Sequence, residues 1–240
     1  MKLSIGHLYP DLLNLYGDRG NIQCMRKRCE WRGIGAEVTE FSLQDKIDFT
    51  KLDIVLLGGG SDREQQIVCT RLQTIRDDMK AYVEDGGSVI AVCGGYQLLG
   101  HYYETDDGRM EGLSLVDLYT VQDSPRLISN IVLKNNEVFP YEIVGFENHG
   151  GRTYTGSNRP FGEVVYGSGN NGKDGKEGVL YKNVVGTYLH GPLLPKNPHV
   201  CDYLLSNALE RKYGKGDLQE LDDTQEREAN RYICERFQVK

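Results

Sequence analysis

The stretch Ser-Val-Ile-Ala-Val-Cys-Gly-Gly-Tyr-Gln at residues 88–97 decides the fold, because a cysteine there joins an apolar run to a helical one. Ser88–Val92 has the length and apolar character of a strand buried on both faces. Two glycines follow Cys93, and a short helical segment runs on through Leu99. A buried strand leading directly into a helix is typical of a parallel α/β sheet. We therefore expect Cys93 at the carboxyl end of a parallel strand.

Outward from this stretch, strands and helices alternate through the first half of the chain. We expect strands at 3–8, 36–41 and 52–57, and helices at 19–32 and 61–84. Beyond residue 113 the pattern changes to short strands with turn residues, at 127–133, 142–146, 162–166, 178–181 and 184–189. Residues 167–176 read as an exposed loop, and 200–212 and 224–237 as helices.

The predicted fold class is α/β, with three layers. A mostly parallel sheet is flanked by helices, and extra strands are added in the second half. We expect one domain over residues 1–240, with a core of about 1–200 and a helical C-terminal extension of about 200–240.

Composition excludes several classes of function. The formal charge is −7, from 28 basic and 35 acidic residues, and the one dense basic run, at 26–28, reads as a solvated helix face. We therefore expect no nucleic-acid binding. No apolar run approaches the ~20 residues of a membrane span, and the N-terminus does not resemble a signal peptide, so we expect a cytoplasmic protein without membrane insertion. The six cysteines form no C-x-x-C pair, which argues against a structural zinc site.

Cys93 is the candidate nucleophile. A thiol at a strand–helix turn faces the positive end of the helix, so we expect a lowered thiol pKa. The N–H of Gly94 could then donate to an oxyanion formed when Cys93 attacks a carbonyl. The alternative is a buried structural cysteine. We adopt that interpretation for the other five, Cys24, Cys29, Cys69, Cys201 and Cys234.

Two further segments lie at the carboxyl ends of predicted strands in the same sheet. Gly58-Gly59-Gly60-Ser61 lacks the Lys-Ser/Thr of a P-loop, so it is either a tight turn or an oxyanion loop in which Gly59 and Gly60 donate N–H groups. His190 ends an apolar strand beside Gly191 and could serve Cys93 as general base and then as acid. For His7, His101 and His199 we expect structural or surface roles.

Together these residues resemble class I glutamine amidotransferases. Ala91–Gln97 is similar to the nucleophile elbow G-x-C-x-G-x-Q, with Ala91 replacing the first glycine, while residues 58–61 and 188–191 resemble the oxyanion loop and the histidine segment. Gly145–Thr153 resembles the G-[FY]-E-x-H-x-G-x-T segment of cobyric-acid-synthase-type members. The resemblance covers roughly residues 1–200. It implies a flavodoxin-like fold and hydrolysis of L-glutamine.

Within that group, the chain is most similar to glutaminase subunits of lipid II isoglutaminyl synthases, which are stand-alone chains of this size. This resemblance implies a heterodimer in peptidoglycan biosynthesis, at the inner face of the membrane where the lipid-linked acceptor lies. A Mur-ligase-like partner that holds ATP and Mg would use the ammonia to amidate the α-carboxyl of D-glutamate in the lipid II stem peptide. This chain would need no cofactor and no metal.

The resemblance also implies the residues that bind substrate. Arg126 would hold glutamine, and a guanidinium suits an α-carboxylate. Gln97, Asn148 and His149 are further substrate-binding candidates.

One position departs from the family pattern. Many members carry a glutamate two residues after the histidine, where this chain has Pro192. Either another carboxylate of this chain completes the triad or the partner supplies the acid, and we favour the partner. Three alternatives stay open: a subunit serving a different synthetase of the cobyric type, a stand-alone γ-glutamyl hydrolase or cysteine peptidase, and a non-catalytic binding module.

Overall fold

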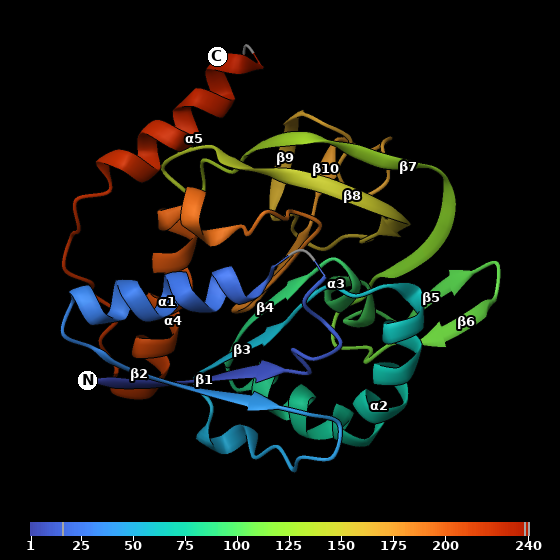
Figure 1. Ribbon diagram of the computed structural model, residues 1–240, viewed down its shortest axis with the longest axis horizontal. Helices are drawn as coiled ribbons and strands as arrows, with labels where there is room; N and C mark the ends of the chain where they lie inside the picture. The colour runs from blue at the N-terminus through green and yellow to red at the C-terminus, as the bar shows by residue number, and fades with distance from the viewer. Residues whose placement is uncertain (16, 238, 240) are drawn as a thin grey trace.

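The computed structural model describes residues 1–15, 17–237 and 239, and two sheets organise them (Figure 1). The first sheet has the strand order β11-β12-β4-β3-β1-β2. Its strands are β1 (Lys2–Leu8), β2 (Gly35–Phe41), β3 (Ile54–Leu57), β4 (Ser88–Val92), β11 (Val179–Tyr181) and β12 (Val184–Thr187). Neighbouring strands are parallel except for the antiparallel pair β11–β12. The buried apolar runs predicted from the sequence form the centre of this sheet.

Helices flank the first sheet, as the sequence predicts. They are α1 (Arg19–Trp31), α2 (Asp62–Glu84), α3 (Gly94–Leu98) and α4 (Pro198–Tyr213), with short 3₁₀ turns η1 (Phe49–Lys51) and η2 (Leu194–Lys196). Ser61 caps α2 in a capping box with Glu64, which satisfies backbone N–H groups at the start of the helix. The predicted three-layer α/β fold is confirmed for this half of the molecule.

The extra strands of the second half form a separate, mostly antiparallel sheet. It runs β10-β9-β7-β5-β6, and β8 pairs with β7. The strands are β5 (Tyr102–Thr105), β6 (Gly108–Glu111), β7 (Tyr119–Lys134), β8 (Ile143–Tyr154), β9 (Gly162–Tyr166) and β10 (Lys176–Glu177). The sequence reading missed the β5–β6 hairpin, because Tyr103 and Met110 are the only buried residues of these two strands and give too short an apolar pattern.

The segment 167–176 is only partly the exposed loop that its composition predicts. Asn170 and Asn171 are buried. Asn170 Oδ1 accepts from Tyr96 Oη at 3.0 Å and from Gly178 N at 2.9 Å, and Asn171 Nδ2 donates to Thr153 O at 3.1 Å. These amides replace water for buried polar groups, so a polar composition here does not mean exposure.

Arg28 also departs from the sequence reading, which placed it on a solvated helix face. Its side chain is 2% exposed and donates from Nε to Asp202 Oδ1 at 2.7 Å and from Nη1 to Asp223 Oδ1 at 2.6 Å. Asp202 belongs to α4, and Asp223 is the N-cap of α5 (Thr224–Arg236). One buried guanidinium therefore joins α1, α4 and the start of the C-terminal helix.

The parallel strands bring four segments to one edge of the first sheet. Residues 9–15 follow β1, Gly58–Gly60 follow β3, Cys93 follows β4, and residues 188–190 follow β12. His190 forms an antiparallel bridge with Phe146 of β8, so the second sheet approaches the same edge. Ligands of open α/β sheets bind at this edge. No helix in the described residues is long and apolar enough to cross a membrane.

Candidate active site

Cys93 stands on a strained turn between β4 and α3. Its φ is +51° and its ψ −108°, a conformation that costs free energy for any residue with a side chain. Cys93 N donates to Thr187 O at 2.8 Å, and Gly95 N donates to Gly58 O at 3.1 Å. A Cβ at residue 95 would come within 2.4 Å of Leu57 O, so only glycine fits there. These contacts hold the thiol at the sheet edge, as a nucleophile elbow requires.

The thiol of Cys93 is protonated in this state, which corrects the expected low pKa. Burial raises the pKa of Cys93 to about 12, the charge of Asp18 adds to the rise, and the Gly94 N–H opposes it. The helix after Cys93 has five residues and too few aligned peptides to offset burial. The nucleophile therefore needs a base.

The glycine loop lies against Cys93, and a carboxylate occupies one of its predicted oxyanion donors. A Cβ at residue 59 would lie 3.1 Å from Cys93 Cβ. Gly59 N donates to Asp18 Oδ2 at 2.8 Å. Asp18 is fully buried, and burial raises its pKa to about 6, against the effect of the Gly59 bond. The sequence analysis missed Asp18, because nothing in its local pattern marks it.

His190 is buried and neutral. Its backbone N donates to Phe146 O at 2.8 Å, and its O accepts from Phe146 N at 3.3 Å, which fixes the segment against β8. Burial lowers the pKa of His190 to about 3, and His149 and Arg126 act in the same direction. A neutral imidazole can accept a proton, but a pKa this low makes His190 a weak base, so the predicted role of base requires a group that stabilises its protonated form.

Beside these groups lies a cavity of about 170 Å³, well below the ~300–1,000 Å³ of drug-sized ligand sites. Cys93 contributes to its wall, as do Gly60 of the glycine loop and the predicted binding residues Gln97, Arg126 and His149. The structure thus brings together residues from four distant parts of the sequence around a space that fits a free amino acid. Leu15, Gln65 and Tyr103 also line it and were not predicted.

Arg126 projects into this cavity from a β-bulge of β7, where the pairing with β8 shifts between Gln122 and Leu127. Arg126 Nε donates to Asn148 Oδ1 at 3.1 Å, and Nη2 donates to Asn148 O at 3.0 Å. Asn148, which is predicted to bind substrate, orients Arg126 in this structure.

Gln97 and His149 are held by a buried network. Gln97 Nε2 donates to Tyr188 Oη at 3.1 Å, and Gln97 Oε1 has no hydrogen-bond partner within the described residues. The His149 ring stacks on Tyr188 at 3.6 Å between centroids. His149 Nδ1 lies 2.7 Å from Gly151 O, which can only accept, so Nδ1 carries the proton. Gln97 therefore presents an acceptor near the cavity, whereas His149 Nε2 lies 3.8 Å from the buried Glu147 Oε2.

The histidine segment rests on a carboxyl group that the sequence did not reveal. Glu177 is fully buried and accepts from Tyr188 N at 2.6 Å and Thr187 Oγ1 at 3.0 Å. Burial raises the pKa of Glu177 to about 8, so it is mostly protonated at neutral pH. It fixes the backbone that leads to His190.

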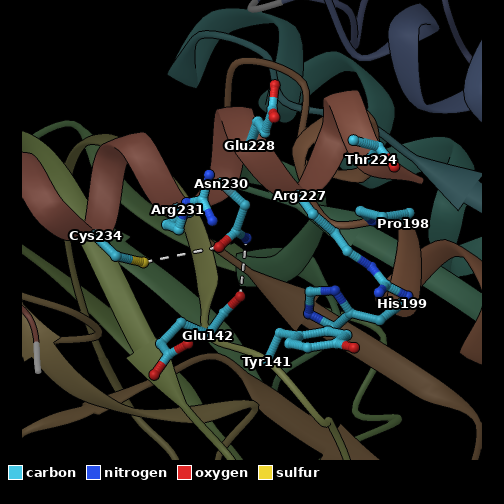
Figure 2. A pocket seen from close by; sticks show the side chains of 10 residues that line it. All are labelled: Tyr141, Glu142, Pro198, His199, Thr224, Arg227, Glu228, Asn230, Arg231 and Cys234. Carbon is cyan, nitrogen blue, oxygen red and sulfur yellow. Dashed lines mark hydrogen bonds between the residues drawn. The ribbon is translucent and has the colours of Figure 1, made fainter.

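A larger cavity, of about 410 Å³, lies under α5 and is a weaker candidate for catalysis (Figure 2). Tyr141, His199 and Arg227 form one side of it, and Cys234 lies at the other end. The Asn230 side chain is fixed by a hydrogen bond from its Nδ2 to Glu142 O at 2.9 Å. Burial raises the pKa of Cys234 to about 11, and the negative charge of Glu142 adds to the rise.

Comparisons with known proteins agree with this geometry. Residues 4–198 match the CobB/CobQ-like glutamine amidotransferase domain. The lipid II isoglutaminyl synthase (glutamine-hydrolyzing) subunit GatD of Staphylococcus aureus is 45% identical over 98% of this chain and 96% of its own length. The subunit of the same name from Streptococcus pneumoniae is 43% identical over 91% and 84%.

More distant relatives share less of their length or only the fold. Cobyric acid synthase of Clostridium botulinum is 30% identical over 62% of this chain, which covers 32% of that enzyme. The structure of PurLQS from Thermotoga maritima has a TM-score of 0.58 at 18% identity, over 88% of this chain and 99% of that one, and shares the fold. With its nucleophile elbow, glycine loop and buried histidine in place, the chain belongs to the CobB/CobQ-like glutamine amidotransferase family.

Proposed function

We propose that this chain is the glutaminase subunit of a lipid II isoglutaminyl synthase. The observation that carries the proposal is the 45% identity with a subunit of that enzyme over nearly the whole of both chains. The site supports it, since Cys93 and Arg126 line one cavity of amino-acid size. Ammonia made here would serve peptidoglycan biosynthesis, where the partner amidates the D-glutamate α-carboxyl of lipid II.

In the proposed reaction, Cys93 Sγ attacks the side-chain amide carbon of glutamine and His190 takes the thiol proton. The tetrahedral oxyanion is held by the N–H groups of Gly94 and of the Gly59–Gly60 loop. His190 returns the proton to the amide nitrogen, the C–N bond breaks, and ammonia leaves a thioester. Water then adds to the thioester, giving its proton to His190, which returns it to the sulfur as glutamate departs.

A Mur-ligase-like synthetase would be the partner, and ATP and Mg would bind there. The position that carries the orienting glutamate in many relatives is Pro192 in this chain. We propose that an acid of the partner orients His190 on assembly, which would couple glutamine hydrolysis to the presence of an acceptor. Equal rates of glutamine hydrolysis by the isolated chain and by the complex would contradict this.

Reconstitution tests the function directly. We expect the chain, co-purified with a Mur-ligase-like partner, to support ATP- and glutamine-dependent amidation of a lipid II analogue, read as a mass loss of about 1 Da when carboxyl becomes amide. A cobyric-type corrinoid substrate is the matched negative. Amidation of the corrinoid, with the lipid II analogue unchanged, would assign the chain to the other synthetase.

Arg126 should control affinity for glutamine more than turnover. Arg126→Ala removes the guanidinium that Asn148 orients toward the cavity, and a charge-assisted bond of ~1.5–3 kcal/mol corresponds to a rise in KM of about 10- to 100-fold. Steady-state glutaminase assays on the complex measure it. Arg159→Ala, which removes an exposed arginine paired with Glu137, is the control. An unchanged KM in the Arg126 variant would remove Arg126 from the binding site.

A further inference from the structure

Asp18 places a carboxylate where the substrate's oxyanion would bind. Its Oδ2 accepts from Gly59 N at 2.8 Å. The same oxygen lies 3.7 Å from a Cβ placed at residue 59, and that Cβ would be 3.1 Å from Cys93 Cβ. A carboxylate oxygen has the charge and the acceptor geometry of the oxyanion of a tetrahedral intermediate. A donor bonded to Asp18 cannot serve the intermediate at the same time.

The segment before Asp18, which includes Leu13 and Leu15, lies directly over the glycine loop Gly58–Gly60. Leu15 N donates to Gly59 O at 3.0 Å, and a Cβ at residue 58 would come within 2.2 Å of Leu13 O. Leu15 is 55% exposed and also lines the cavity that contains Cys93. The segment therefore extends from a buried contact on Gly59 to the solvent-exposed rim of the site.

Two unfavourable features are concentrated in this segment. Asp18 is fully buried, and its Oδ1 has no hydrogen-bond partner within the described residues. A buried acceptor without a partner destabilises the folded chain. Tyr9, where the segment leaves β1, is also fully buried and has a φ of +54°. Backbone strain of this kind is unfavourable and is common in segments that switch. The observed position of the segment therefore carries costs that a displaced position could relieve.

We infer that Asp18 is a displaceable plug of the oxyanion hole, which holds the isolated chain in a resting state until the glutamine side-chain amide takes its place at Gly59. The inference rests on the proposed function, because it takes Cys93 as the nucleophile. Asp18 restrains the site twice: it occupies a donor, and its negative charge beside Cys93 disfavours the thiolate. Such a resting state keeps Cys93 unreactive until glutamine occupies the site.

Removing the plug should make Cys93 more reactive, which loss of a merely structural residue would not do. In the isolated chain, Asp18→Asn removes the charge and Asp18→Ala removes both the charge and the acceptor. A neighbouring charge shifts a pKa by about 1–3 units, so we expect alkylation of Cys93 by iodoacetamide at pH 7.5 to be about tenfold faster in Asp18→Asn, and at least as fast in Asp18→Ala. Mass spectrometry of the Cys93 peptide gives the rate. Asp11→Asn, an exposed carboxylate of the same segment, should leave it unchanged.

The wild-type chain provides a second measurement, in case the variants do not fold. Labelling with 6-diazo-5-oxo-norleucine places a substrate-like carbonyl at Cys93, and amide hydrogen exchange over residues 9–18 should then become faster. Variants that alkylate no faster than wild type, or unchanged exchange on labelling, would overturn the plug. Neither result bears on whether Cys93 is the nucleophile, which alanine replacement of Cys93 decides separately.

Discussion

Replacement of Cys93 by alanine is expected to abolish glutamine-dependent amidation by the assembled enzyme while amidation from added ammonia continues. The thiol is the only proposed nucleophile at the cavity. Removing the nucleophile from a set of catalytic groups that act together lowers the rate by about 10⁴-fold or more. The partner binds ATP and acceptor by itself in the proposed scheme, so it needs only ammonia. The measurement is amidation of a lipid II analogue with glutamine or with an ammonium salt.

The assay with an ammonium salt distinguishes loss of glutamine hydrolysis from a folding defect. Cys93 is 7% exposed on a strained turn, so a folding defect would impair assembly and lower both activities. Cys24→Ala, a half-buried thiol of α1, is the matched control and should keep both. If Cys93→Ala retained glutamine-dependent activity, Cys93 would be a structural cysteine and the proposed function would fail.

Replacement of His190 by glutamine should lower kcat for glutamine hydrolysis by about 10²- to 10⁴-fold, the usual contribution of a general base. The need for a base comes from the thiol. Burial raises the pKa of Cys93 far above neutral pH, so the thiol is protonated and must lose its proton before it attacks. Glutamine has a side chain of similar volume, and the bridge to Phe146 uses only the backbone of residue 190, so we expect the variant to fold. His101→Gln, at an exposed histidine, is the control.

The pH profile checks the same assignment. The pKa of His190 is lowered to about 3, so its imidazole stays neutral, and able to accept a proton, at every pH well above 3. In the isolated Asp18→Asn variant, which lacks the carboxyl that titrates near 6, kcat/KM for glutamine hydrolysis from pH 5 to 8 should therefore show no inflection near the ordinary histidine value of ~6.5. An inflection there would mean that His190 is solvated or paired with an acid already in the isolated chain, and an inflection that appears only in the complex would fit an acid supplied by the partner.

The parts of the site that could be predicted from the sequence are those carried by the main chain of the parallel strands. An apolar run that ends at Cys93, at Gly58–Gly60 or before His190 must deliver the next residues of the chain to one sheet edge, whatever the other segments do. Arg126 and His149 were predicted to bind substrate only through the resemblance to a family. They lie on a second sheet, and no short motif specifies the register of its strands.

The features that were missed depend on contacts between distant residues. Asp18 and Glu177 are ordinary acidic residues in sequence, and they matter because the fold buries them against Gly59 and Tyr188. The low thiol pKa expected of Cys93 was wrong for the same reason, since burial is set by segments far away in the chain. Local pattern predicts which groups reach the edge of the sheet, but not the environment that sets their ionisation.

The buried Arg28 defines how far the chain can be shortened. The matched family region ends at residue 198, so a minimal domain trimmed there would lack both Asp202 and Asp223. The same cut removes α4, whose buried residues include Val200, Leu204 and Leu205, so the core would lose apolar packing as well as both ion pairs of Arg28. The last forty or so residues therefore stabilise the catalytic core. A core domain expressed without them would fold poorly.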